Sequence, residues 1–381
     1  MKDIISIDIR MLLSVILIII LIHAFVNMNR RKSTSKVFMC IISLIILVLV
    51  LEMIDTILNN SNLKQFIMIH WVVNILGFMI APCIPFLGYI LVKGWINRYN
   101  NEETKTSWLL GIPLAMNAIA TLMGIFGYGS FYITSQNIYH RGPLLFVLPS
   151  ICYFYFGYSL LYIFKNYKKF VLSEQIIFSL FYVVPAIFIS IQLRYPVYLT
   201  TWSSAAIVII ITYIFILNDQ AYCDSLTGLG NRLFYERYTQ NLNRKNLRQL
   251  YLVFIDIDKF KSINDQYGHK EGDEAIKIFA HLLLQSFPLR KKRIVRLGGD
   301  EFLVMIQENN KHKAEEYVCN LTNRLMEYNN REEKPYKLTF SYGLSRYLKD
   351  YENVCQLLEN ADQLMYEQKQ RRKKSYLVDN Q

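Results

Sequence analysis

The sequence predicts a two-part protein: an all-α bundle of about seven transmembrane helices over residues 1–217 and an α+β domain over residues 224–381, joined by a short connector at 218–223. Two observations support this division. Hydrophobic residues make up 53% of the chain, yet the long apolar blocks all lie before residue 218. The remainder has an ordinary charged composition, in which strand-like and helix-like periodicities alternate.

The N-terminal part contains seven apolar segments of transmembrane length. A helix needs about 20 mostly apolar residues to cross a hydrocarbon core about 30 Å thick. The segments that meet this requirement are residues 9–28, 37–58, 66–92, 107–127, 144–164, 175–192 and 199–217. The first one lacks the basic start and the small-residue cleavage site of a removable signal peptide, so we expect it to be retained as a span.

The charges of the loops predict the topology. Up to residue 218 the chain has 15 basic and 7 acidic residues, so most of the net charge of +12 lies here. Ten of the 15 basic residues fall in alternate loops: Arg30, Arg31, Lys32, Lys36, Lys93, Arg98, Lys105, Lys165, Lys168 and Lys169. The positive-inside rule places these loops and the C-terminal domain in the cytoplasm and the N-terminus outside. No nucleic-acid recognition motif is present, so we expect no nucleic-acid partner.

Five residues of the second and third spans are unusual at membrane depth. Ionisable groups are costly there, so Glu52, Asp55 and His70 are candidates for a sensing pocket. The alternative is that they only mark helix ends, and we prefer it because both acids lie near the expected interface. Pro82 and Pro85 are expected to kink the third span.

Four acids are expected to gather in the C-terminal part. The run YLVFIDID at 251–258 has a buried-strand pattern and ends in acids, and two further apolar runs, 293–297 and 302–307, flank Gly-Gly-Asp-Glu at 298–301. The oxygen-rich cluster, with no His or Cys beside it, suits magnesium rather than zinc. Acids in turns are usually solvated, however, so the residues alone leave both interpretations open.

Five ordered motifs resolve this choice: DSLTGLGNR, FIDIDKFKSINDQYGHKEGDEA, RLGGDEF, SYGLS and ADQLMYEQK. Together they closely resemble the GGDEF domain of diguanylate cyclases over residues 220–376. The resemblance implies a palm-like, nucleotide-cyclase fold with a mainly antiparallel sheet flanked by helices. It also implies the activity, which is the condensation of two GTP molecules into cyclic di-GMP and two pyrophosphates.

The resemblance assigns metal-binding and catalytic roles. In the family, the residues matching Asp256 and Asp300 hold Mg²⁺, with Mn²⁺ as an alternative ion, and the carbonyl of Ile257 and the side chain of Glu301 assist. Phosphoryl transfer needs such ions to neutralise triphosphate charge and to activate the attacking hydroxyl. By the same analogy Asp300, with Glu301, helps to deprotonate the 3′-hydroxyl.

The resemblance also assigns substrate contacts. Asn264 and Asp273 match the residues that read guanine; an amide facing O6 and a carboxylate facing the N1 and N2 hydrogens suit guanine rather than adenine. The alternative for both residues is helix capping. The residues that match triphosphate contacts are Asp258, Lys259 and Phe260 through their backbone, and Lys261, Lys369 and Lys373.

Two departures from the family pattern stand out. The family ends the last motif with AKxxGRN, whereas Arg372 and Lys373 replace its glycine and arginine here, which puts substrate affinity in doubt. Many relatives carry an inhibitory product site, RxxD, shortly before the signature. The corresponding residues here are Leu289, Arg290, Lys291 and Lys292, which lack the acid, so we expect no product inhibition through such a site.

The expected protein is therefore a homodimeric diguanylate cyclase of the bacterial inner membrane. Each domain binds one GTP, and the ring product needs two nucleotides that face each other, so two copies must meet. The bundle is expected to sense an unidentified ligand and to act through the connector. The alternative is a degenerate GGDEF domain that binds nucleotide and regulates without catalysis.

Overall fold

A computed structural model describes most of the chain, which divides into two compact units, Met1–Ile216 and Leu217–Gln381. The described residues are 2–28, 33–96, 107–167, 170, 172–195, 201–242, 244–287, 289, 293–348, 351 and 354–378. Among the basic loop residues that predict the topology, seven lie outside this set: Arg30, Arg31, Lys32, Arg98, Lys105, Lys168 and Lys169. The two units are described separately.

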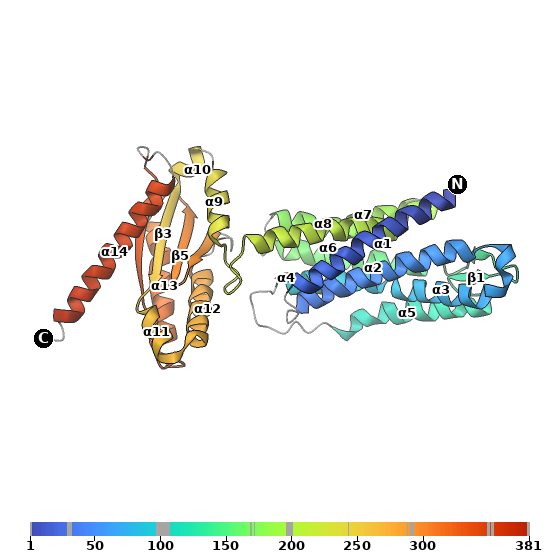
Figure 1. Ribbon diagram of the computed structural model, residues 1–381, viewed down its shortest axis with the longest axis horizontal. Helices are drawn as coiled ribbons and strands as arrows, with labels where there is room; N and C mark the ends of the chain where they lie inside the picture. Colours follow the sequence, from blue (N-terminus) through green and yellow to red (C-terminus); the bar gives the residue numbers. More distant parts are fainter. Residues whose placement is uncertain are drawn as a thin grey trace. The chain divides into compact units, whose positions relative to one another are not determined.

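The first unit is helical apart from one short hairpin (Figure 1). Its helices are α1 (Lys2–Asn27), α2 (Ser33–Leu58), α3 (Ile67–Ile80), α4 (Cys83–Ile96), α5 (Ile112–Leu122), α6 (Val147–Lys165), α7 (Leu172–Arg194) and α8 (Thr201–Ala221), with short 3₁₀ turns at Ser61–Phe66, Trp108–Gly111 and Met123–Phe126. Within the described residues, seven helical segments are long and apolar enough to cross a membrane, which confirms the predicted bundle.

The third span is broken at its prolines, as predicted. Helix α3 ends at Ile80 and α4 begins at Cys83, so the interruption lies at Ala81 and Pro82. Proline has no N–H to donate to the preceding turn, and its ring excludes the carbonyl four residues earlier. The two halves both pack against α2. Pro85 lies in the first turn of α4, where a missing N–H costs least.

A β-hairpin, which the sequence did not predict, closes one end of the bundle. It pairs β1 (Phe131–Ile133) with β2 (Tyr139–Arg141) in antiparallel register. Asn137 lies in its turn with φ of +62°, a conformation that asparagine tolerates better than most residues. The side chain of Asn137 is fully buried and donates to the carbonyls of Leu58 and Leu63, at 2.6 and 3.1 Å.

The second unit is built on a four-stranded antiparallel sheet in the order β4-β5-β3-β6 (Figure 1). The strands are β3 (Leu250–Ile257), β4 (Ile294–Gly298), β5 (Glu301–Gln307) and β6 (Phe340–Arg346). The helices are α9 (Arg232–Gln240), α10 (Arg244–Arg248), α11 (Phe260–Tyr267), α12 (His269–Ser286), α13 (Lys311–Asn329) and α14 (Val354–Val378). This antiparallel sheet with flanking helices confirms the predicted α+β class.

Strand β3 is buried on both faces because helices cover both sides of the sheet. Its odd-numbered residues, such as Val253 and Ile255, pack with α12 and α13, whereas Leu252 and Phe254 pack with α14 and α9. Successive side chains of a strand point to opposite faces, so the even-numbered residues of β3 all lie on one face of the sheet. Asp256 therefore lies on the face that α14 covers.

The predicted connector, 218–223, is mostly helix, because α8 continues to Ala221. Asp224 then forms a turn, as expected: its Oδ1 accepts from the amide and the hydroxyl of Thr227 at 2.8 and 2.7 Å. The guanidinium of Arg296, on β4, pairs with the same carboxylate at 3.1 Å. Burial alone would raise the pKa of Asp224, but the Thr227 hydrogen bonds and Arg296 hold this pKa below its usual value.

Replacing Asp224 with asparagine is expected to lower the free energy of unfolding of the second unit by about 1–3 kcal/mol at pH 7, because a partly buried, hydrogen-bonded charge pair is broken. Since the folded pKa is lowered, the stabilisation is present above the ordinary carboxylate pKa of about 4 and is lost as the pH falls through the folded value. Pulse proteolysis of the full chain in detergent and urea measures the effect. The matched control, Glu236→Gln, breaks an exposed pair with Arg232 and should cost less than about 0.5 kcal/mol. Equal effects of the two changes at pH 7 would contradict the argument.

Candidate active site

The end of β3 and the β4–β5 hairpin bring the predicted acids together. Asp256 lies directly opposite Glu301 in the β3–β5 register. The amide of Ile257 donates to the carbonyl of Asp300 at 3.3 Å, so pairing continues into the hairpin tip. Asp256 is 9% exposed, Asp300 is half-buried and Glu301 is exposed. The structure thus brings together the four residues that the sequence assigned to a metal.

The tip of the hairpin depends on its glycines. The β4–β5 register shifts between Arg296 and Gly298, which marks a β-bulge before the turn. Gly299 has φ of +51°, where other L-residues are strained. The guanidinium of Arg296 donates to the carbonyl of Gly299 at 2.9 Å and supports this turn from within the strand. The local sequence therefore positions Asp300 beside β3.

The carboxylates of Asp256, Asp300 and Glu301 repel one another, and this repulsion affects how readily Asp300 and Glu301 are protonated. Burial, followed by the charge of Asp256, raises the pKa of Asp300 above its usual value. Burial, followed by the charges of Asp300 and Asp256, likewise raises the pKa of Glu301. A divalent cation would relieve this repulsion, and the oxygen-only donor set suits a hard ion such as Mg²⁺.

The acids nevertheless do not form a complete metal cage. No group of three or more His, Cys, Asp or Glu side chains among the described residues converges closely enough to hold a metal. This is compatible with Mg²⁺, which proteins usually bind through one or two carboxylates together with water and substrate phosphates. The residues therefore fit a metal that arrives with a nucleotide better than a permanently bound one.

Two cations of α14 lie against the acids of β3. The ammonium of Lys369 is 2.5 Å from Oδ1 of Asp256. One turn later, Nη1 of Arg372 donates to Oδ2 of Asp258 at 3.2 Å and to the carbonyl of Phe340 at 2.6 Å. Lys369, predicted to contact phosphate, thus neutralises a predicted metal ligand in this structure. A metal ion and Lys369 would compete for the same carboxylate oxygen.

The backbone amide and the carboxylate of Asp258 both have hydrogen-bond partners within the protein. Its amide donates to the carbonyl of Thr339 at 2.9 Å, and its carboxylate accepts from Ser341 at 2.7 Å as well as from Arg372. The Asp258 amide, predicted to contact phosphate, therefore has a protein partner in this structure, and its contact with phosphate stays a prediction. Lys259 has φ of +56° and turns the chain into α11. The backbone amides of Lys259 and Phe260 lie in this turn, and we still expect them to bind phosphate.

The predicted guanine contacts come from two neighbouring helices. Asn264 lies half-buried on α11, and Asp273 is exposed on α12. Gly272 is needed between them, since a Cβ at this position would lie 1.9 Å from Oδ1 of Asn264. Neither residue caps a helix: α11 and α12 are preceded by Lys259 and Gly268, without side-chain capping bonds. Both side chains lack hydrogen bonds within the described part of the chain, so they can serve a ligand.

The remaining predicted residues are placed only in part. Lys261 is exposed on α11. The side chain of Lys373 lies outside the described residues, and so do Arg290, Lys291 and Lys292 of the segment that lacks the inhibitory motif. The sequence did not predict that Arg372 binds Asp258, although a signal exists. Lys369 and Arg372 are three residues apart and share a helix face, while Asp256 lies on β3 and Asp258 follows two residues later, directly after the end of the strand.

The C-terminal unit is similar to known proteins. Residues 221–375 match the family described as "Diguanylate cyclase, GGDEF domain". The C-terminal unit is a GGDEF domain. The diguanylate cyclase DgcS of Shewanella oneidensis is 33% identical over 159 residues, which cover 40% of this chain and 51% of that protein. The diguanylate cyclase DgcZ of Escherichia coli is 32% identical over 162 residues, which cover 41% and 53%.

Among solved structures, the GGDEF domain of PA1120 from Pseudomonas aeruginosa is 31% identical and covers 39% of this chain and 89% of its own, with a TM-score of 0.35. The chain spans about half the length of the two curated relatives. GGDEF diguanylate cyclases generally use a divalent metal, in line with the acids at the β4–β5 tip.

Removing the positive charge of Lys369 is expected to strengthen metal binding before any nucleotide is present. Lys369→Met leaves Asp256 without its ammonium partner, so the apparent Mn²⁺ affinity should rise about fivefold, the size expected for a partly exposed pair. Electron paramagnetic resonance of Mn²⁺ with the nucleotide-free full chain measures it. Lys277→Met, an exposed lysine paired only with Glu274, serves as the control and should change nothing. An unchanged or lower affinity in Lys369→Met would show that Asp256 is not a metal ligand.

Proposed function

We propose that this protein is a membrane-bound diguanylate cyclase, which condenses two GTP molecules into cyclic di-GMP and two pyrophosphates. The observation that carries the proposal is the pairing of β3 with β5, which places Asp256 beside the hairpin tip with Asp300 and Glu301. Asn264 and Asp273 present unused amide and carboxylate groups on one side of the same domain. These are the groups that a guanine base and a triphosphate require.

In the proposed complex each residue has a separate task. Asn264 and Asp273 bind the guanine edge, while Lys261, Lys369, Lys373 and the amides of the turn at 259–260 bind the triphosphate. The carboxylates of Asp256 and Asp300, with the Ile257 carbonyl and Glu301, hold Mg²⁺ or Mn²⁺. The ion neutralises phosphate charge and acidifies the attacking hydroxyl. For the metal to reach Asp256, Lys369 must transfer from this carboxylate to the phosphates.

The chemical step is a pair of reciprocal displacements. The 3′-oxygen of each GTP attacks the α-phosphorus of the other, the bond to the β-phosphate oxygen breaks, and pyrophosphate leaves. Asp300, assisted by Glu301, accepts the hydroxyl proton. Because one domain holds one GTP, the working form is a homodimer whose two half-sites face each other.

The seven apolar helices support a place in the bacterial inner membrane. The basic loops favour an extracytoplasmic N-terminus and a cytoplasmic GGDEF domain, where GTP is available. Helix α8 starts among the apolar helices and continues to Ala221, three residues before Asp224. We propose that changes in the bundle reach the GGDEF domain through this helix and alter how often two half-sites meet.

A second candidate is a nucleotide-binding regulator without turnover. Two ion pairs of α14 favour this function. Lys369 pairs with Asp256, and Arg372, at the position of the family's glycine, pairs with Asp258. The acids at the signature argue against it, because Asp256, Asp300 and Glu301 are all retained.

Replacing Asp300 with alanine separates the two functions. In membranes supplied with GTP and Mg²⁺, the parent should form cyclic di-GMP, detected by mass spectrometry, and Asp300→Ala should lower the rate by about 10²-fold or more, because a metal ligand and a base are lost together. The control Glu316→Ala, on the exposed face of α13, should leave the rate unchanged. A parent that binds GTP but forms no cyclic dinucleotide would favour the regulator.

A further inference from the structure

The helical unit contains a cavity of about 330 Å³ whose walls come from α1, α2, α3, the β-hairpin, α6, α7 and α8. This volume lies at the lower end of the range for ligand pockets, about 300–1,000 Å³. Much of the wall is aliphatic, with Val48, Leu51, Val73, Leu148 and Ile189 among the contributors. Protein interiors are close-packed, so a hollow of this size within a helical bundle is a candidate binding site.

A buried arginine is one of the polar residues that line this cavity. Arg10 is 8% exposed, and its Nη1 donates to the Glu52 carbonyl at 3.1 Å and to the Thr56 hydroxyl at 2.8 Å. Its Nε is 3.4 Å from a Glu52 carboxylate oxygen but has no hydrogen-bond partner among the described residues, and Nη2 has none there either. A guanidinium has five donors, and leaving them unsatisfied in a buried place is costly.

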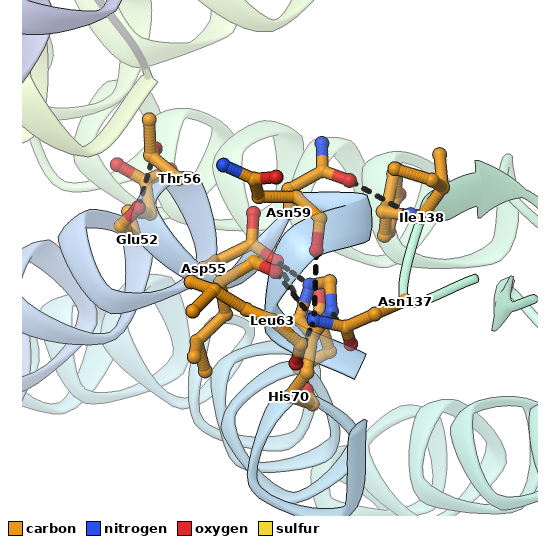
Figure 2. Close-up of polar contacts among 12 residues, drawn as sticks. Glu52, Asp55, Thr56, Asn59, Leu63, His70, Asn137 and Ile138 are labelled. Atoms are coloured by element: carbon orange, nitrogen blue, oxygen red, sulfur yellow. Dashed lines mark hydrogen bonds and ion pairs between the residues drawn. The ribbon is translucent and has the colours of Figure 1, made fainter. Parts of the chain in front are cut away.

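The acidic residues of the cavity are partly engaged within the protein. Oδ1 of Asp55 lies 2.9 Å from Nε2 of His70 and 2.6 Å from Nδ2 of Asn74, and Nδ1 of His70 lies 2.9 Å from the buried Asn137 side chain of the hairpin turn. Figure 2 shows this group joining α2 and α3 to the hairpin. Asp55 and Glu52 line the cavity and His70 supports it, so the preferred view that they only mark helix ends is not supported.

A second guanidinium stands at the exposed part of the wall. Arg141, at the end of β2, donates to the Gln192 carbonyl at 3.5 Å and has no carboxylate partner among the described residues. Both sets of unused donors therefore belong to cations, whereas Asp55 accepts two bonds and Glu52 is paired with Arg10. The unused donors at Nη2 of Arg10 and on Arg141 suit an anion, and the aliphatic wall suits a hydrocarbon part beside it.

We propose that this cavity binds a small amphipathic carboxylate, with its acid group against Arg10 and its apolar part against the aliphatic wall. Arg–carboxylate pairs are planar and charge-assisted, and they gain strength where water is excluded. The molecule can come from the bilayer, as a short fatty acid, or from the aqueous side, as a small aromatic acid. The proposal concerns binding only and does not depend on catalysis by the GGDEF domain.

The test uses quenching of tryptophan fluorescence in the detergent-purified full chain, because Trp202 lines the cavity. The probe is 8-bromooctanoate, with 8-bromooctanol as its uncharged counterpart. The proposal predicts saturable quenching by the acid that disappears in Trp202→Phe, and non-saturable quenching by the alcohol. Competition by octanoate identifies a fatty acid as the preferred class, and competition by phenylacetate identifies an aqueous aromatic acid.

Two variants probe the site itself. Arg10→Gln should weaken the binding of 8-bromooctanoate about tenfold or more, since a charge-assisted pair is lost. The control Arg194→Gln removes an exposed arginine at the end of α7 and should have no effect.

Gly77→Leu tests the cavity independently if the Arg10→Gln variant fails to fold. Gly77 lines the cavity, and a Cβ at this position meets no atom within 4 Å, so the start of a larger side chain has open space. Leucine should project into the cavity from this position and abolish binding. Quenching that is equal for the acid and the alcohol, or binding that survives Gly77→Leu, would overturn the proposal.

Discussion

The antiparallel pairing of β3 with β5 is the constraint on which the GGDEF site depends. It places Asp256 opposite Glu301, and the bulge and the left-handed Gly299 then turn Asp300 back toward the end of β3. A slip of one residue in this register would send every side chain of β3 to the other face, and would take Asp256 away from α14. The same pairing that forms the sheet thus assembles the acids.

Helix α14 supplies the cations that pair with the acids at the end of β3. Gln368 accepts from the Tyr342 amide at 2.7 Å and fastens the helix to β6, so Lys369 and Arg372 are held against Asp256 and Asp258. The ion pairs keep buried carboxylates neutralised while no nucleotide is bound, which lowers the cost of burying them. In the proposed complex, a nucleotide and its metal would replace these protein cations.

Much of this could be predicted from local sequence. Helix length and apolarity predicted the seven spans, Pro82 predicted the break between α3 and α4, and the strand pattern of 251–258 predicted β3. Contacts between distant segments could not be predicted in this way. Asn137 bonds to residues that precede it by 74 and 79 positions, and Lys369 follows Asp256 by 113. No periodicity carries such information, because it depends on how whole elements pack.

The most direct test of the account is a structure of the full chain with Mg²⁺ and a GTP analogue that does not react. The account predicts that one metal ion contacts the carboxylates of both Asp256 and Asp300, and that the ammonium of Lys369 has moved from Asp256 to a phosphate oxygen. A bound nucleotide with Lys369 still paired to Asp256, and no metal ion between the two carboxylates, would contradict it.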